Sequence, residues 1–181
     1  LEVMPKPSRF LVPTGVNRSR MPSSGDTPSF TPPVPHKHMM ANGLKILVVE
    51  KPSLPLVSFG LLIHAGSTTD PGHQPGLSHL TTAMLSEGTT TRSSQQIATE
   101  FEFIGSYLSA ATGREHVLLS ADTLKEHWPK ALELLADVVQ RPTFPEREWV
   151  RIRRNHLTNL QRVRDDPVAI AERVARMLLY G

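Results

Sequence analysis

The 181-residue sequence contains no cysteine, which excludes a disulfide framework, a thiolate nucleophile and a cysteine-ligated metal site. It also lacks any apolar run near the roughly 18 to 20 residues that a membrane-spanning helix needs. Charge of one sign is not in large excess either: the formal net charge is +3, too small to indicate nucleic-acid binding. With 39% hydrophobic residues, the sequence still predicts one packed domain rather than a disordered chain.

Proline is the abundant residue, and its distribution divides the chain. Half of the 16 prolines lie in the first 35 residues, where large apolar residues are few and no period of 2 or 3.6 is visible. We therefore interpret residues 1–35 as an extended arm or linker, partly polyproline II, and residues 36–181 as the folded domain. The arm is either unimportant or wraps a partner. No signal-peptide pattern is visible, so such a peptide has been removed or the chain begins within a longer protein.

The elements after residue 36 alternate between strand and helix patterns. Asn42-Gly43 between apolar runs predicts a hairpin, and Ser93 is suited to cap a helix. Strands are expected at residues 56–63, 107–111 and 116–120, and helices at 75–86, from 93, at 124–140, at 145–164 and from 166. The order predicts an α+β fold, with an antiparallel sheet of four or more strands and helices packed on one face. On the helix at 124–140 we expect the apolar face to comprise Trp128, Leu132, Leu135 and Val139.

A catalytic zinc helix needs two histidines one turn apart and a carboxylate base, and no complete motif of this kind occurs. Two stretches, residues 112–116 and 123–127, contain Glu-His but lack the first histidine. The first lies in an expected strand, where neighbouring side chains point to opposite faces, and the second at the solvated edge of a helix. Neither is interpreted as a metal site.

A third stretch carries a closer similarity. Residues 76–89 read Gly-Leu-Ser-His-Leu-Thr-Thr-Ala-Met-Leu-Ser-Glu-Gly-Thr, which resembles the zinc helix of the pitrilysin or insulinase family, inverted-motif metallopeptidases that include the mitochondrial processing peptidases. The similarity continues through the hairpin at Asn42-Gly43, the strand at residues 56–67, residues 131–137 and the Asp-Asp-Pro at 165–167. It covers residues 36–181 and indicates the N-terminal half-domain, truncated at its C-terminal end.

The resemblance places His79 at the first ligand position, Thr82 at the general base, Ala83 at the second ligand and Asn159 at the third. A methyl group donates no electrons to Zn²⁺, a neutral amide is a weak ligand, and a threonine hydroxyl takes no proton near pH 7. We therefore expect no catalytic residue, no bound metal and no cofactor, although intact family members hold zinc. One alternative stays open: His156 and Asn159 share a helix face, and a makeshift site forms if that face meets His79.

These departures predict a catalytically silent subunit that pairs with an active zinc peptidase of the same family and forms part of a chamber for unfolded peptide. Two alternatives remain, an active zinc metalloendopeptidase with displaced ligands and an unrelated peptide- or protein-binding module. Whether the chain is an enzyme stays undecided by the sequence. Its Arg-rich helix at 145–164 carries an apolar stripe and acidic residues, which argues against nucleic acid. The Pro-rich lead, the lack of cysteine and the resemblance to exported bacterial members indicate a periplasmic or secreted location.

Overall fold

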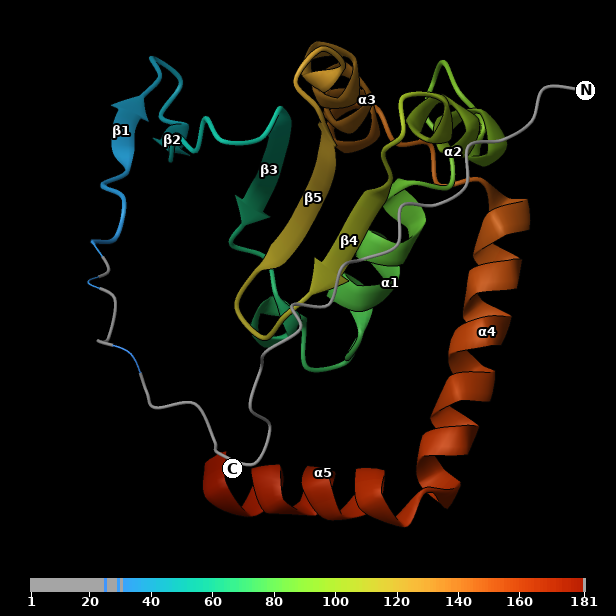
Figure 1. The fold of residues 1–181 in the computed structure, drawn as a ribbon. Coiled ribbons are helices and arrows are strands. Elements are labelled where there is room, and N and C mark those ends of the chain that lie inside the picture. Colours follow the sequence, from blue (N-terminus) through green and yellow to red (C-terminus); the bar gives the residue numbers. More distant parts are fainter. Residues whose placement is uncertain (1–24, 26–28, 30, 181) are drawn as a thin grey trace, which may run out of the picture. The chain divides into compact units, whose positions relative to one another are not determined.

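The computed structural model describes residue 25, residue 29 and residues 31–180 (Figure 1). These residues fall into two compact units that divide between Lys51 and Pro52. Most of the proposed arm, residues 1–35, lies outside the described residues, so its boundary with residue 36 stays a prediction. Within the described part of the chain, no helix is long and apolar enough to cross a membrane.

The first unit contains an antiparallel hairpin of β1 (His36–Met39) and β2 (Lys45–Val48). Gly43 in its turn has φ 85°, a left-handed conformation that a residue without a Cβ adopts at little cost. The neighbouring Asn42 stabilises the turn, because its Oδ1 accepts a hydrogen bond from the N–H of Leu44 at 3.1 Å. The hairpin that the Asn-Gly pair predicted is confirmed.

The second unit is built on a three-stranded antiparallel sheet. β5 (Val117–Leu124) lies between β3 (Leu56–Ile63) and β4 (Leu108–Thr112), which form the two edges. In the described residues this sheet has three strands rather than the expected four or more, because β1 and β2 pair with each other in a separate sheet. Within the part of the chain that the structure describes, β4 is therefore an edge strand that pairs only with β5.

β5 extends further than the sequence suggested. Leu124 at its end pairs with Leu56 at the start of β3, so the strand runs well past Ser120. The following helix therefore begins at Trp128 rather than at Leu124, and Glu126 lies in the connecting turn rather than on a helix. The end of β5 is determined by its pairing along the whole of β3. The sequence of β5 alone does not show which strand it pairs with, so this end could not be predicted from it.

The loop after β3 is fixed to the turn between β4 and β5. A Cβ on Gly66 would lie 2.2 Å from the carbonyl oxygen of Arg114, so only glycine fits there. The N–H of Ser67 donates to the carbonyl of Gly113 at 3.1 Å, and the N–H of Thr68 donates to that of Arg114 at 2.8 Å. These bonds attach the end of β3 to the hairpin formed by the other two strands.

Helices α2 (Ser94–Phe103) and α3 (Trp128–Gln140) cover one face of this sheet. Alternate residues of β5 are buried, and the residues between them face the other side. The buried core of strand and helices comprises Ile97, Phe101, Ile104, Val117, Leu119, Ala121, Ala131, Leu134, Leu135 and Val138. The expected α+β fold, an antiparallel sheet with helices on one face, is confirmed.

The apolar face expected on α3 was partly wrong. Leu135 is buried, but Trp128 and Leu132 each remain 42% exposed. The residues that face β5 instead are Ala131, Leu134, Leu135 and Val138. The apolar residues of α3 form two overlapping helical stripes, one through Leu134 and one through Leu135. Packing against the sheet decides which parts of these two stripes are buried.

Helix α1 (Leu77–Leu85) is held at its start by a carboxylate. The N–H groups of Gly76 and Ser78 each donate to Asp70 at 2.8 Å, which satisfies donors that have no partner within the helix. Loss of hydration raises the pKa of Asp70, but the N–H groups of Ser78 and Gly76 outweigh it and hold that pKa below its ordinary value.

Helix α4 (Glu146–Asp165) packs against α1, and α5 (Pro167–Tyr180) follows it after a break. Asp166 at the break accepts a hydrogen bond from the N–H of Val168 at 2.9 Å and so caps the start of α5. Neither helix contains a fully buried residue. In Figure 1, α4 and α5 run in clearly different directions.

Candidate functional site

The face of α1 that bears His79 meets α4. The imidazole rings of His79 and His156 lie with their centroids 4.9 Å apart and their planes inclined by 38°. His79 is exposed, whereas His156 is half-buried. A makeshift metal site would require His79 to contact the face of α4 that bears His156 and Asn159. His156 makes this contact.

Asn159 does not join this contact. It is exposed, although Ile152, His156 and Val163 on the same side of α4 are half-buried. Because α1 begins at Leu77, two residues before His79, it has no further turn with which to cover Asn159. Of the two residues expected to face His79, Asn159 is therefore the one that does not.

Thr82 is buried, with only 4% of its surface exposed. Its hydroxyl donates to the carbonyl oxygen of Ser78, one turn earlier in the same helix, at 2.8 Å. The hydrogen of this hydroxyl is therefore directed at the helix backbone. Ala83, the next residue, is half-buried and contributes only a methyl group.

The donor set around His79 does not fit a catalytic zinc ion. Such an ion typically has three protein ligands, and the residues gathered here are two imidazoles, a hydroxyl and a methyl group. Across residue 25, residue 29 and residues 31–180, no group of three or more histidine, aspartate or glutamate side chains is placed to hold a metal. The other two Glu-His pairs contribute nothing, since His116 lies in the β4–β5 turn and His127 faces Glu126 at 3.6 Å.

A second polar cluster, around Arg92, was missed by the sequence analysis. Arg92 forms ion pairs with Glu100 at 2.9 Å, Glu133 at 2.9 Å and Asp137 at 2.8 Å. Lys130 adds a further ion pair to Glu100 at 3.0 Å. The cluster joins α2 and α3 to the loop that follows α1. One signal was available: Asp137 interrupts the apolar stripe of α3, and a carboxylate in such a place needs partners.

Asp137 is the buried member of the Arg92 cluster, at 6% exposure. One oxygen accepts hydrogen bonds from Thr89 at 2.8 Å, Thr91 at 3.0 Å and Arg92 at 2.8 Å. Burial raises the pKa of this carboxyl, but the donors from Thr89, Arg92 and Thr91 together bring the pKa below its ordinary value. Lys130 and Arg92 likewise lower the pKa of Glu100. The cluster is thus held charged at neutral pH.

The comparison with known families decides the relationship. Residues 45–180 match the family model described as insulinase (peptidase family M16). The chain belongs to peptidase family M16. The resemblance seen in the sequence is confirmed, and an unrelated binding module is excluded.

Individual M16 relatives show how much of such a protein this chain represents. It is 35% identical over 128 residues to an uncharacterized zinc protease of Rickettsia felis, which covers 71% of this chain and 31% of the relative. It is 32% identical over 149 residues to the mitochondrial-processing peptidase subunit beta of Bos taurus, covering 82% of this chain and 30% of that subunit. The chain therefore spans about a third of the length of these relatives.

A solved M16 structure shares the fold. The peptidase M16 inactive domain from Pseudomonas fluorescens superposes with a TM-score of 0.73 at 32% identity, over 77% of this chain and 34% of that one. The relatives named zinc proteases indicate that zinc belongs to intact members of the family.

Proposed function

We propose that this chain is a catalytically silent M16 subunit or domain, which pairs with an active zinc peptidase of the same family and forms part of its peptide-binding chamber. The contact of Thr82 with Ser78 is the observation that carries the proposal. A general base must accept a proton from the attacking water, but Thr82 offers a neutral hydroxyl whose hydrogen is already donated to its own helix. No carboxylate replaces it among the described residues around His79.

Pairing with a second subunit is supported by the relatives. Two of them are named as the alpha and the beta subunit of mitochondrial-processing peptidase, in Solanum tuberosum and Bos taurus. A silent chain is useful when a partner with the intact motif supplies the chemistry. A periplasmic or secreted location is part of the same proposal.

Binding of unfolded peptide is supported by the edge strand β4. Its outer edge has no strand partner within the described residues, so its free N–H and C=O groups are available to an extended peptide. Three small residues, Ser109, Ala110 and Ala111, are exposed along it and leave the backbone accessible. In Figure 1, α1 lies beside this strand, so the strand and the face of His79 belong to one region.

One experiment tests both the lack of catalytic activity and the binding of peptide. The purified chain is assayed for zinc by elemental analysis, for hydrolysis of an unfolded protein, and for binding of a fluorescein-labelled unfolded peptide by anisotropy. We expect substoichiometric zinc, no hydrolysis and measurable binding. Tightly held stoichiometric zinc with hydrolysis would instead establish the second candidate, an active endopeptidase with displaced ligands, which the contact between His79 and His156 favours.

The control for peptide binding uses two proline variants of β4. Adjacent N–H groups of a strand point to opposite edges. Of the two variants Ser109→Pro and Ala110→Pro, one therefore removes a hydrogen bond to β5, and the other removes an N–H donor from the free edge. The variant that retains its folding stability is the edge variant, and it should lose peptide binding. Unchanged binding by that variant would show that the peptide does not add to β4.

A further inference from the structure

One face of the hairpin in the first unit carries three side chains of the kinds that bind soft metal ions. His36 and His38 are two residues apart in β1, so their side chains lie on the same face. Met40 follows at the same interval, and its N–H donates to the carbonyl oxygen of Leu44 at 2.9 Å, which extends the pairing of the two strands by one position. Two imidazoles and a thioether are therefore in a row along one face of the strand.

The spacing and the exposure allow these groups to reach one ion. Residues two apart in an antiparallel strand are separated by about 6.8 Å along it. Two imidazole nitrogens on one ion lie no more than about 4 Å apart, since each bond to the metal is about 2 Å long. Rotation of the side chains covers this difference, because both histidines are exposed and their rings form no hydrogen bond or ion pair with any residue that the structure describes. Met40 is 43% exposed, so its sulfur is also within reach of an ion.

The rest of this face is apolar and carries no charge. Across the hairpin, the residues paired with the two histidines are Ile46 and Val48. Ile46 is half-buried, whereas every other residue of the two strands is exposed, so part of this face is shielded from water. The two lysines of the hairpin, Lys37 and Lys45, lie on its other face. A cation held by the histidines therefore has no ammonium group beside it on the same face.

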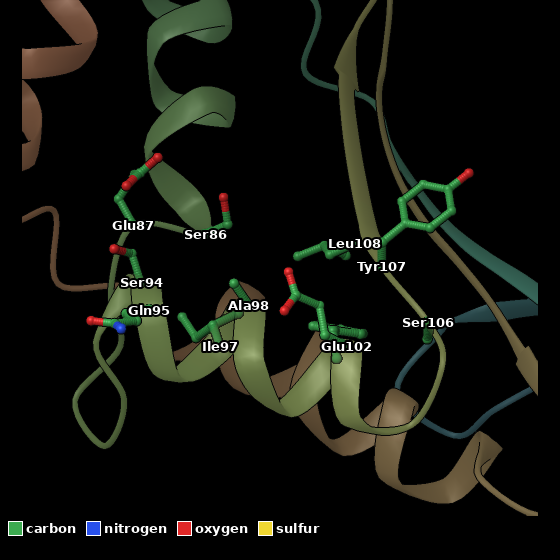
Figure 2. A pocket seen from close by; sticks show the side chains of 11 residues that line it. Ser86, Glu87, Ser94, Gln95, Ile97, Ala98, Glu102, Ser106, Tyr107 and Leu108 are labelled. Carbon is green, nitrogen blue, oxygen red and sulfur yellow. The ribbon is translucent and has the colours of Figure 1, made fainter.

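The donor atoms favour a soft ion over a hard one. Residues 36–49 contain no carboxylate, whereas calcium and magnesium take oxygen ligands. Thioether sulfur selects Cu(I), and imidazole is a common copper ligand as well. The hollow of about 390 Å³ beside α2 has the opposite chemistry, because Glu87 and Glu102 supply oxygen atoms and neither histidine nor methionine is among the residues that line it (Figure 2). The hairpin therefore differs from that hollow in offering nitrogen and sulfur.

We propose that His36, His38 and Met40 bind one Cu(I) ion on this face of the hairpin. The two imidazoles and the thioether supply three ligands, and the apolar residues across the hairpin limit the access of water to the ion. Zinc can use the same imidazoles but has little preference for a thioether, so Met40 is the residue that makes the site selective. The match to the family model begins at residue 45, so all three ligands lie outside it, and the site is independent of the proposed peptide-binding role.

The test titrates the full chain with Cu(I) under anaerobic conditions, with bicinchoninate as the coloured competing ligand. We expect the unaltered chain to withdraw one Cu(I) per chain from the coloured complex. Met40→Leu should weaken the affinity at least about tenfold, because loss of even a group that only orients a metal ligand typically costs this much. Met39→Leu makes the same change at the neighbouring residue, on the other face of the strand, and should leave the affinity unchanged.

Two further measurements keep the test specific. His38→Ala should weaken Cu(I) binding, whereas Lys37→Ala, which removes a side chain from the other face of the same strand, should not. In the unaltered chain labelled with ¹³C at its methionine methyl groups, the NMR resonance of Met40 should shift when Cu(I) is added, while that of Met39 stays in place. The variants that replace each methionine by leucine assign the two resonances.

Three results would overturn the inference, and none of them bears on the peptide-binding role. If Met40→Leu and Met39→Leu bind Cu(I) equally, the thioether is not a ligand. If His79→Ala loses Cu(I) binding while His38→Ala retains it, the ion binds at the contact between α1 and α4 instead. If the unaltered chain withdraws no Cu(I) and the methyl resonance of Met40 does not move, the face of the hairpin holds no copper.

Discussion

The two polar clusters that flank α1 differ in how their groups are satisfied. Around Arg92, charged groups of opposite sign are paired, and the buried Asp137 receives three hydrogen bonds. Around His79, two imidazoles face each other without a carboxylate, and the hydroxyl of Thr82 bonds to its own helix. The first cluster joins elements of the fold, whereas the second contributes to no network of this kind. Among the described residues, those of the first cluster are paired by charge, while the groups gathered around His79 include no carboxylate.

The largest effect is expected when the Arg92 cluster loses its buried member. Asp137→Ala removes the acceptor for Thr89, Thr91 and Arg92, and it leaves a largely buried guanidinium with one partner fewer. We expect a loss of about 3 kcal/mol or more in the free energy of unfolding, the scale for breaking a buried pair. Urea unfolding followed by circular dichroism measures it. A loss as small as that of a surface substitution would show that the cluster does not hold the fold.

Acid should weaken the same cluster. The pKa values of Asp137 and Glu100 lie below their ordinary values of 3.8 and 4.5, so these groups stabilise the fold above those values. That contribution is lost as the pH falls through the lower pKa values of the folded state. Unfolding measured from pH 6 down to about pH 2 should therefore show a smaller loss in Asp137→Asn than in the unaltered chain. Parallel curves for the two proteins would contradict this.

The site around His79 should respond by gaining a function rather than by losing stability. Ala83→His places a further imidazole one helical turn from His79, whose ring already lies beside that of His156. Three imidazoles satisfy the usual ligand count for zinc, and we expect at least about tenfold tighter zinc binding, or roughly 1.4 kcal/mol. Titration calorimetry measures it, with Asn159→His as the control, since Asn159 is exposed and outside the contact. Equal binding by both variants would show that the two histidines do not define a site.

The smallest effect is expected for His79→Ala. His79 is exposed, and its ring contacts the tilted ring of His156. Replacing it with alanine should therefore change the free energy of unfolding by less than about 1 kcal/mol. Thermal unfolding with and without added zinc checks this. If His79→Ala lowered the melting temperature strongly, and added zinc stabilised the unaltered chain but not the variant, His79 would be the ligand of a structural metal. The contrast between the two clusters would then disappear.

Local signals in the sequence were sufficient for the parts of the fold that short-range chemistry determines. Asn42-Gly43 forms its turn, Asp166 caps α5, and Ser93 forms a reciprocal cap with Gln96. Each of these depends on neighbours within a few residues. The degenerate ligand positions on α1 came instead from the resemblance of residues 76–89 to the zinc helix of the family.

The remaining features depend on partners distant in the sequence. The end of β5 is fixed by its pairing with β3, and the buried face of α3 by its packing on the sheet. Exposure of Asn159 follows from where α1 begins, which the pattern of α4 does not contain. The Arg92 cluster brings together residues up to 45 positions apart, from Arg92 to Asp137. The residues next to Arg92 in the sequence do not indicate that it pairs with Asp137.

The close approach of Gly66 to Arg114 has a mechanical consequence. A peptide drawn along β4 would exert a force parallel to the strands, which acts to slide β4 and β5 past β3. A slip of one residue in the register would turn the buried side chains of a strand to the opposite face of the sheet. The bonds from Ser67 and Thr68 to Gly113 and Arg114 tie the end of β3 to the far end of the β4–β5 hairpin. The sheet therefore resists shear as one unit, and a force applied along β4 is spread over all three strands.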